Sequence, residues 1–158
     1  MVRIQSTGQL KRMKIAVEGL EKKRVSVGWF DTAKYSNGVP VAYVAAIQEF
    51  GYPTGGIPAR PFVRPTLASK KTQWSEILKA GGSQVVKGAM TVDQMLGQFG
   101  MLAAGNISEA IAAVSDPALA ASTIRARAAR RASPGASIKP LVDTGLMIQS
   151  VSSRVEDV

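Results

Sequence analysis

The chain has 158 residues, of which 46% are apolar and 20% are charged, a length and composition typical of one compact domain over residues 1–158. The 20 Lys and Arg residues exceed the 11 Asp and Glu residues, which gives a net charge of +9. Neither Cys nor His occurs, and this excludes disulfides, thiolate nucleophiles, imidazole bases and the usual zinc ligands.

The first predicted elements are a helix and a strand. Apolar residues recur at spacings of three and four within residues 7–23, which is typical of a short amphipathic helix. Its apolar positions are Leu10, Met13, Ala16 or Val17, and Leu20. In residues 24–30 the period changes to two, which predicts a β-strand.

A second helix is predicted over residues 41–50, with Pro40 at its start. We expect its buried stripe to consist of Tyr43, Ile47 and Phe50. Four Pro and three Gly then fall within residues 51–65, too many for a regular element. This segment is therefore predicted to be a long loop or extended arm.

The middle of the chain is predicted to be helical. Apolar periodicity resumes at Leu67, and the interruption at Gly81 and Gly82 fits either a kinked helix or two short ones. The clearest helix starts at Thr91, whose side chain forms a capping box with Gln94. One edge of this helix carries a stripe of small or flexible residues at which another backbone could approach closely, namely Gly97, Met101 and Gly105.

The last third is predicted to hold two more helices and a second strand. Asp116 and Pro117 fit the N-cap and first position of a helix that runs to about Arg131. After a loop over residues 132–140, a short helix is expected around residues 144–148 and a strand over residues 150–156. Two strands at opposite ends predict an α+β fold, with a small antiparallel sheet packed against several helices.

No chemical motif predicts catalysis or a bound cofactor. The glycines at 51–56 and 81–82 lack the Lys and hydroxyl of a phosphate loop. The acidic residues are scattered singly, so a pair for general acid and base work is not visible from spacing. We therefore expect a protein that is not an enzyme, without catalytic, cofactor-binding or metal-ligating residues.

The segment after Asp116 carries a basic tract that allows two interpretations. Its members are Arg125, Arg127, Arg130 and Arg131. They could neutralise phosphates in a non-specific, salt-dependent contact with nucleic acid. They could equally form a solvated helix end, where the helix dipole favours cations. Residues 1–8 lack an apolar signal segment and no run of about 18 apolar residues occurs, so cytoplasmic synthesis and no membrane partner are expected.

Two segments carry a resemblance to a known family. The first runs from Gln48-Glu49-Phe50-Gly51 through a Gly-rich turn to Ile57-Pro58-Ala59-Arg60-Pro61-Phe62-Val63-Arg64-Pro65. The second is Lys139-Pro140-Leu141-Val142-Asp143-Thr144-Gly145-Leu146-Met147-Ile148-Gln149-Ser150-Val151, in which Met147 and Ile148 shift the usual pattern slightly. Together they resemble the head-tail joining, neck or tail-completion proteins of tailed phages.

The resemblance implies a non-enzymatic virion subunit, made in the bacterial cytoplasm, at the neck or the head-proximal end of the tail. Its expected partners are copies of itself in a ring, commonly sixfold, and adjoining neck and tail proteins. The predicted partner interface is the stiff arm, through Ile57, Pro58, Arg60, Phe62 and Arg64. The alternative for Phe62 is that it caps the chain's own core. If the basic tract faces the lumen, it borders the path of exiting DNA; the alternative function is a basic nucleic-acid-associated protein.

Overall fold

The structure, a computed structural model, describes residues 3–130 and 139–158, without the side chains of residues 3–7, 9 and 130. These residues form six α-helices and a two-stranded antiparallel sheet, which confirms the predicted α+β class. The chain divides into two compact units, each built from separated segments. Unit 1 comprises Met1–Val27, Ser69–Ala104 and Ser152–Val158, and unit 2 comprises Gly28–Ala68 and Gly105–Val151. The prediction of one domain over residues 1–158 stays a prediction.

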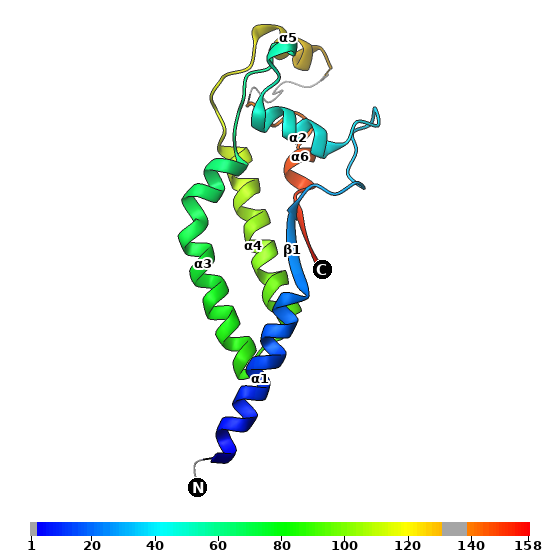
Figure 1. Cartoon of the computed structure of the whole chain (residues 1–158). Helices are drawn as coiled ribbons and strands as arrows, with labels where there is room; N and C mark the ends of the chain where they lie inside the picture. Colours follow the sequence, from blue (N-terminus) through cyan, green and yellow to red (C-terminus); the bar gives the residue numbers. More distant parts are fainter. Residues whose placement is uncertain (1–2, 131–138) are drawn as a thin grey trace. The chain divides into compact units, whose positions relative to one another are not determined.

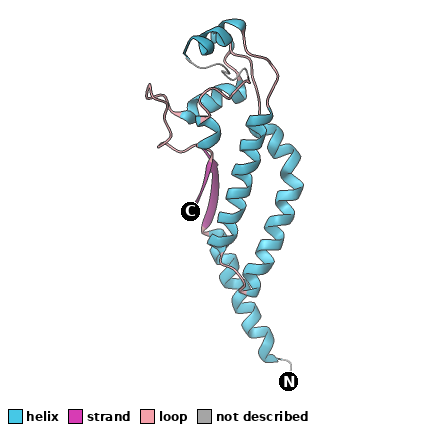
Figure 2. Cartoon of the chain, turned by 180° about the vertical axis from the view of Figure 1, so that it is seen from behind, coloured by secondary structure: helices cyan, strands magenta, loops and turns pink. Residues whose placement is uncertain are grey.

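The sheet of unit 1 pairs strand β1 (Lys23–Gly28) with strand β2 (Ser152–Asp157), close to the predicted positions (Figure 2). It packs on helix α4 (Val92–Ala113) at Gly100. A Cβ at this position would lie 2.7 Å from the Cβ of Ser153 and 2.9 Å from Val25, so only glycine lets the sheet approach so closely. The close approach that we predicted on the edge with Gly97 and Gly105 is not made, because no atom lies within 4 Å of a Cβ at either residue.

Helices α3 (Val63–Lys87) and α4 lie side by side in unit 1 (Figure 1). Helix α3 runs unbroken through the two glycines, and a Cβ at Gly81 would lie 2.6 Å from Met95 of α4. Gly81 is thus a close contact between helices and does not break α3. The predicted capping box is confirmed: Thr91 N–H donates to Gln94 Oε1 at 2.9 Å and Gln94 N–H donates to Thr91 Oγ1 at 3.1 Å.

Helix α1 (Arg3–Glu21) covers the predicted N-terminal helix and begins earlier. Only Ala16 of its apolar stripe is buried; Leu10, Met13, Val17 and Leu20 are exposed. Gly19 faces Val92 of α4, where a Cβ would lie 3.0 Å from the valine side chain. Helix α1 therefore faces the rest of unit 1 with the narrow side that carries Ala16 and Gly19. Most of its apolar stripe is exposed.

Unit 2 contains helix α2 (Val41–Phe50), the 3-10 turn η1 (Pro53–Gly55), helix α5 (Ala121–Arg130) and the short helix α6 (Leu146–Gln149). Helix α2 has the predicted bounds, but its predicted buried stripe is wrong. Tyr43 and Phe50 are exposed, and the buried side chains are Val41, Ala45 and Glu49. These three are four residues apart, so they share one helix face. Within unit 2, α2 packs against α6.

Two predicted boundaries shift in unit 2. Helix α3 begins at Val63, so residues 63–65 of the predicted arm are helical. Pro65 fits there because the first N–H groups of a helix need no intrahelical acceptor. Helix α5 begins at Ala121 and not at Pro117, because the carbonyls of Pro117 and Ala118 accept hydrogen bonds from Arg60. The predicted loop at 132–140 lies mostly outside the described residues.

Candidate functional site

The segments that carry the family resemblance, residues 48–65 and residues 139–151, are called the first and second family-like segments. The carboxylate of Glu49 connects the two ends of the first one. Its oxygens accept hydrogen bonds from the backbone N–H groups of Phe62 at 2.7 Å, Val63 at 2.9 Å and Arg64 at 3.0 Å. These are the first N–H groups of α3, which lack intrahelical acceptors and form the positive end of the helix dipole. The last turn of α2 therefore caps the start of α3. We call this set, with the Arg64 side chain, the Glu49 clamp.

The Arg64 side chain completes the Glu49 clamp from the outside. Its Nε donates to Glu49 Oε1 at 2.9 Å and its Nη2 donates to the Glu49 carbonyl at 2.8 Å. The guanidinium also lies over the ring of Phe50, 4.8 Å from the centroid. Burial of the carboxylate by itself raises the pKa of Glu49, but the hydrogen bonds from the backbone and from Arg64 outweigh it and hold the pKa below its ordinary value of 4.5.

Phe62 is packed inside unit 2 and is only 1% exposed. Its ring meets Trp29 edge to face, with centroids 5.8 Å apart. The Trp29 Nε1–H donates to the carbonyl of Met147 at 2.8 Å, so the same aromatic pair also fixes α6. Of the two alternatives for Phe62, the structure supports the core position.

Arg60 is also buried, and it donates to the backbone of a distant segment. Its Nε lies 2.7 Å from the Pro117 carbonyl, its Nη2 lies 3.0 Å from the Ala118 carbonyl and its Nη1 lies 3.4 Å from Gln48 Oε1. A buried guanidinium needs such acceptors because leaving its donors without partners is costly. Arg60 thus ties the segment before α5 to the end of α2.

The burial of Phe62 and Arg60 therefore argues against these two residues as parts of the predicted partner interface, and the interface itself stays a prediction. Phe62 and Arg60 point into unit 2, and Arg64 pairs with Glu49 of the same chain and not with an acid of a neighbour. The physical reason is that the helix start at Val63 needs a cap, and the proline-rich segment turns back to bring it to Glu49. Ile57 is half-buried, and its N–H and C=O both bond Tyr52; of the five, only Pro58 and Arg64 are exposed.

The second family-like segment forms a tight turn into α6. Gly145 adopts a φ of 77°, which favours glycine, and Thr144 Oγ1 accepts from the N–H of Leu146 at 3.3 Å. Ser150 Oγ closes the helix by donating to the Leu146 carbonyl at 2.6 Å. Met147 is buried. Because α2 packs against α6, the two family-like segments meet in unit 2 although residues 66–138 lie between them in the sequence.

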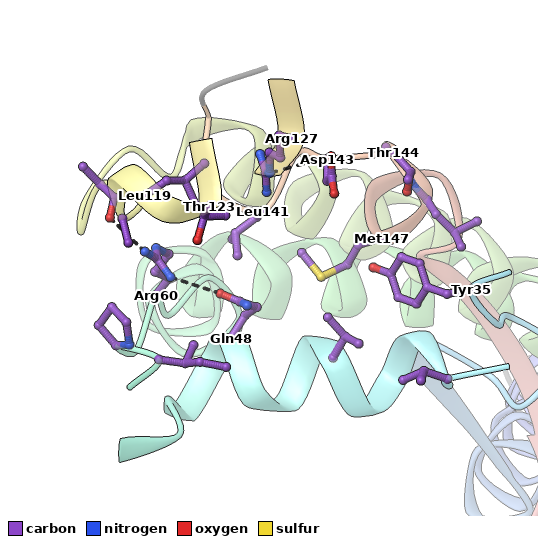
Figure 3. A pocket seen from close by; sticks show the side chains of 18 of the residues that line it. Tyr35, Gln48, Arg60, Leu119, Thr123, Arg127, Leu141, Asp143, Thr144 and Met147 are labelled. Atoms are coloured by element: carbon purple, nitrogen blue, oxygen red, sulfur yellow. Dashed lines mark hydrogen bonds and ion pairs between the residues drawn. The ribbon is translucent and has the colours of Figure 1, made fainter. Parts of the chain in front are cut away.

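A cavity of about 560 Å³ lies between these segments in unit 2. Figure 3 shows Tyr35, Leu141 and Met147 pointing into it, with Arg60 and Arg127 on its wall. Both guanidinium groups are buried and bond main-chain carbonyls of the same chain. These two guanidinium groups on the cavity wall thus serve the fold of unit 2.

The predicted basic patch is not a single exposed surface. Arg125 is exposed, but Arg127 is buried, and its Nη1 donates to the carbonyls of Lys139 at 2.9 Å and Val142 at 3.1 Å. Its Nε lies 3.6 Å from Asp143 Oδ1. Arg127 is thus wrong as a member of a DNA-facing patch. The side chain of Arg130 and all of Arg131 lie outside the described residues.

Within residues 3–130 and 139–158, no group of three or more acidic side chains is placed to hold a metal ion. In the described part of the chain, no helix is both long and apolar enough to cross a membrane.

Comparisons with known proteins give no relative. No known family matches this chain, and neither the curated proteins nor the solved structures contain a match.

Sequence reasoning overlooked the central role of Glu49, which it treated as one of several scattered acids. A signal was present: Glu49 stands in register with Val41 and Ala45, four and eight residues before it, on the face that is buried. A carboxylate on such a face requires donors. The next available donors are the free N–H groups of the helix that follows the proline-rich segment.

Proposed function

We propose that this chain is a non-enzymatic structural protein of a phage virion, which joins head and tail as a subunit of a homo-oligomeric ring at the neck or the head-proximal tail end. One observation carries the proposal. The two segments that resemble such proteins form the interlocked core of unit 2, through the Glu49 clamp and the contact of α2 with α6. The residues that carry the resemblance therefore lie together in one folded unit and stabilise it jointly.

The distribution of apolar side chains supports an assembling subunit. Helix α1 exposes four apolar side chains in one stripe, and Tyr43, Phe50 and Tyr52 are exposed on unit 2. Large contiguous apolar patches on a protein surface mark interaction sites. The proposed partners are other copies of the chain in a ring and adjoining neck and tail proteins, with exiting DNA contacted only through its backbone.

The test is a particle count by negative-stain microscopy in the phage that encodes the chain. We expect inactivation of its coding sequence to give filled heads and detached tails, and expression of the chain in trans to restore joined particles. A silent recoding of the same stretch serves as the control. Normal numbers of tailed particles without the chain would reject the proposal.

The alternative function is a basic nucleic-acid-associated protein. The +9 net charge favours it, whereas the buried Arg127 removes one cation from the proposed phosphate contact. Filter binding to duplex DNA over a salt series separates the two functions, because phosphate contacts make affinity fall steeply with salt. An absence of affinity even at low ionic strength would discard the alternative.

A further inference from the structure

Arg60 carries a buried positive charge on the wall of the unit 2 cavity. The residue is only 5% exposed, and arginine is charged in proteins. Its three acceptors are all neutral, namely the carbonyls of Pro117 and Ala118 and the amide oxygen of Gln48. Among the residues that the structure describes, no carboxylate forms an ion pair with it. A buried charge without a counter-charge is costly, so the site favours an anion.

The acids of α2 and of the cavity wall are engaged by other arginines. Glu49 is held in the Glu49 clamp by Arg64. Asp143 lines the cavity but lies beside Arg127, with its Oδ1 3.6 Å from Arg127 Nε (Figure 3). With two arginines and one aspartate, the described lining keeps a single net positive charge.

The Arg60 guanidinium also retains hydrogen-bonding capacity. An arginine side chain has five N–H donors. The printed acceptors take one donor each from Nε, Nη1 and Nη2, and the contact of Nη1 with Gln48 is the longest at 3.4 Å. One donor on each terminal nitrogen is therefore left without an acceptor in the described part of unit 2. A carboxylate can accept hydrogen bonds from two such donors.

An aliphatic surface lies in the same cavity. It includes Val44, Leu119, Leu141 and Met147, and Figure 3 shows the last two pointing into the cavity. The volume of about 560 Å³ is within the range of cavities that hold small organic ligands. An apolar chain placed there is removed from water, which favours its binding.

We infer that the unit 2 cavity binds a small monocarboxylate with an apolar chain. The carboxylate pairs with Arg60 and the chain packs on the aliphatic surface. A single negative charge matches the single net charge of the lining, whereas a phosphate monoester carries up to about two charges, one of which would remain unmatched near Asp143. The inference goes beyond the proposed virion role and does not depend on it.

Isothermal titration calorimetry of the full chain with octanoate tests the inference. Octanol has the chain without the charge, acetate has the charge without the chain, and octyl phosphate has the chain with a higher charge. We expect octanoate to bind at one site and at least about tenfold more tightly than each of the other three. The inference is overturned if octanoate does not bind saturably, or if any of the other three probes binds as tightly.

The contribution of Arg60 is measured with Arg60→Met. We expect at least about a tenfold loss of octanoate affinity and a change in octanol affinity of no more than about twofold. Arg125→Met is the matched control, because it removes the same charge from an exposed position of α5 in the same unit. It is expected to change octanoate affinity by no more than about twofold. Equal losses in the two variants would show attraction to the net charge of the chain and would overturn the site.

A second variant tests the cavity with Arg60 in place, because Arg60 also holds the segment before α5. Val44→Phe puts a ring at the cavity wall and is expected to lower octanoate affinity at least about tenfold. Ala46→Phe, at an exposed position of the same helix, is its control and is expected to bind octanoate like the unchanged chain. Thermal unfolding followed by circular dichroism shows which variants are folded. Unchanged octanoate affinity in folded Val44→Phe protein would also overturn the inference.

Discussion

The proline-rich segment and helix α1 present their apolar residues in opposite ways. The sequence predicted the proline-rich segment to be a partner interface, and it predicted only an amphipathic helix for the region of α1. Phe62 of the segment is 1% exposed, whereas Leu10 of α1 is 64% exposed. The difference arises because the segment leads into a helix start that needs a cap, while Ala16 is the buried residue among the described apolar side chains of α1. Stiffness and apolar content therefore do not by themselves identify an interface.

The largest expected effect tests the buried side of this comparison. Phe62→Ala removes the ring from Trp29 and leaves a cavity, so we expect the free energy of unfolding to fall by about 3–5 kcal/mol. Chemical denaturation of purified protein measures the loss. Phe50→Ala, at a 66% exposed position, is the matched control and is expected to lose less than about 1 kcal/mol. Equal losses for the two variants would contradict the comparison.

The next effect comes from the Glu49 clamp. Glu49→Gln keeps the shape but replaces a charged acceptor of several N–H groups with an amide, so we expect a loss of about 1.5–3 kcal/mol. Glu21→Gln on α1 is the control, since Glu21 is exposed, and it is expected to change stability by no more than about 0.5 kcal/mol. A Glu49→Gln protein as stable as the unchanged chain would show that the clamp is dispensable.

The same carboxylate predicts a pH dependence. The folded-state pKa of Glu49 lies below its ordinary value of 4.5, so its contribution to stability is fully present above that value and is lost as the pH falls through the lowered pKa. We expect the free energy of unfolding to decline below pH 4.5, and the decline to be smaller in Glu49→Gln. Denaturation midpoints across this acid range measure it; identical pH profiles for both proteins would refute the assignment.

The smallest expected effect on stability belongs to α1. Val17→Asp replaces a side chain that is 50% exposed, so we expect a change of about 0.5 kcal/mol or less in the free energy of unfolding. Thermal unfolding followed by circular dichroism checks it. A loss as large as that of Phe62→Ala would mean that the stripe is covered within its own unit.

The elements were predictable where local signals agreed. The Thr91 and Gln94 capping box and the α2 bounds follow from residues within one turn of each other. The buried face of α2 was mispredicted because Tyr43 and Phe50 are more apolar than Glu49, and only the distant N–H groups of α3 make burial of the carboxylate favourable. Likewise, the acceptors that bury Arg60 and Arg127 lie more than ten residues away in the sequence, which no periodicity reveals.

The Glu49 clamp also holds two helix ends together independently of the residues that connect them. Since the carboxylate bonds residues 62–64 directly, the end of α2 stays fastened to the start of α3 whatever runs between them. The exposed tip at Pro53–Gly56 is consequently a suitable place to insert a foreign epitope or a fluorescent label, because an insertion there leaves the contact between the two helix ends in place.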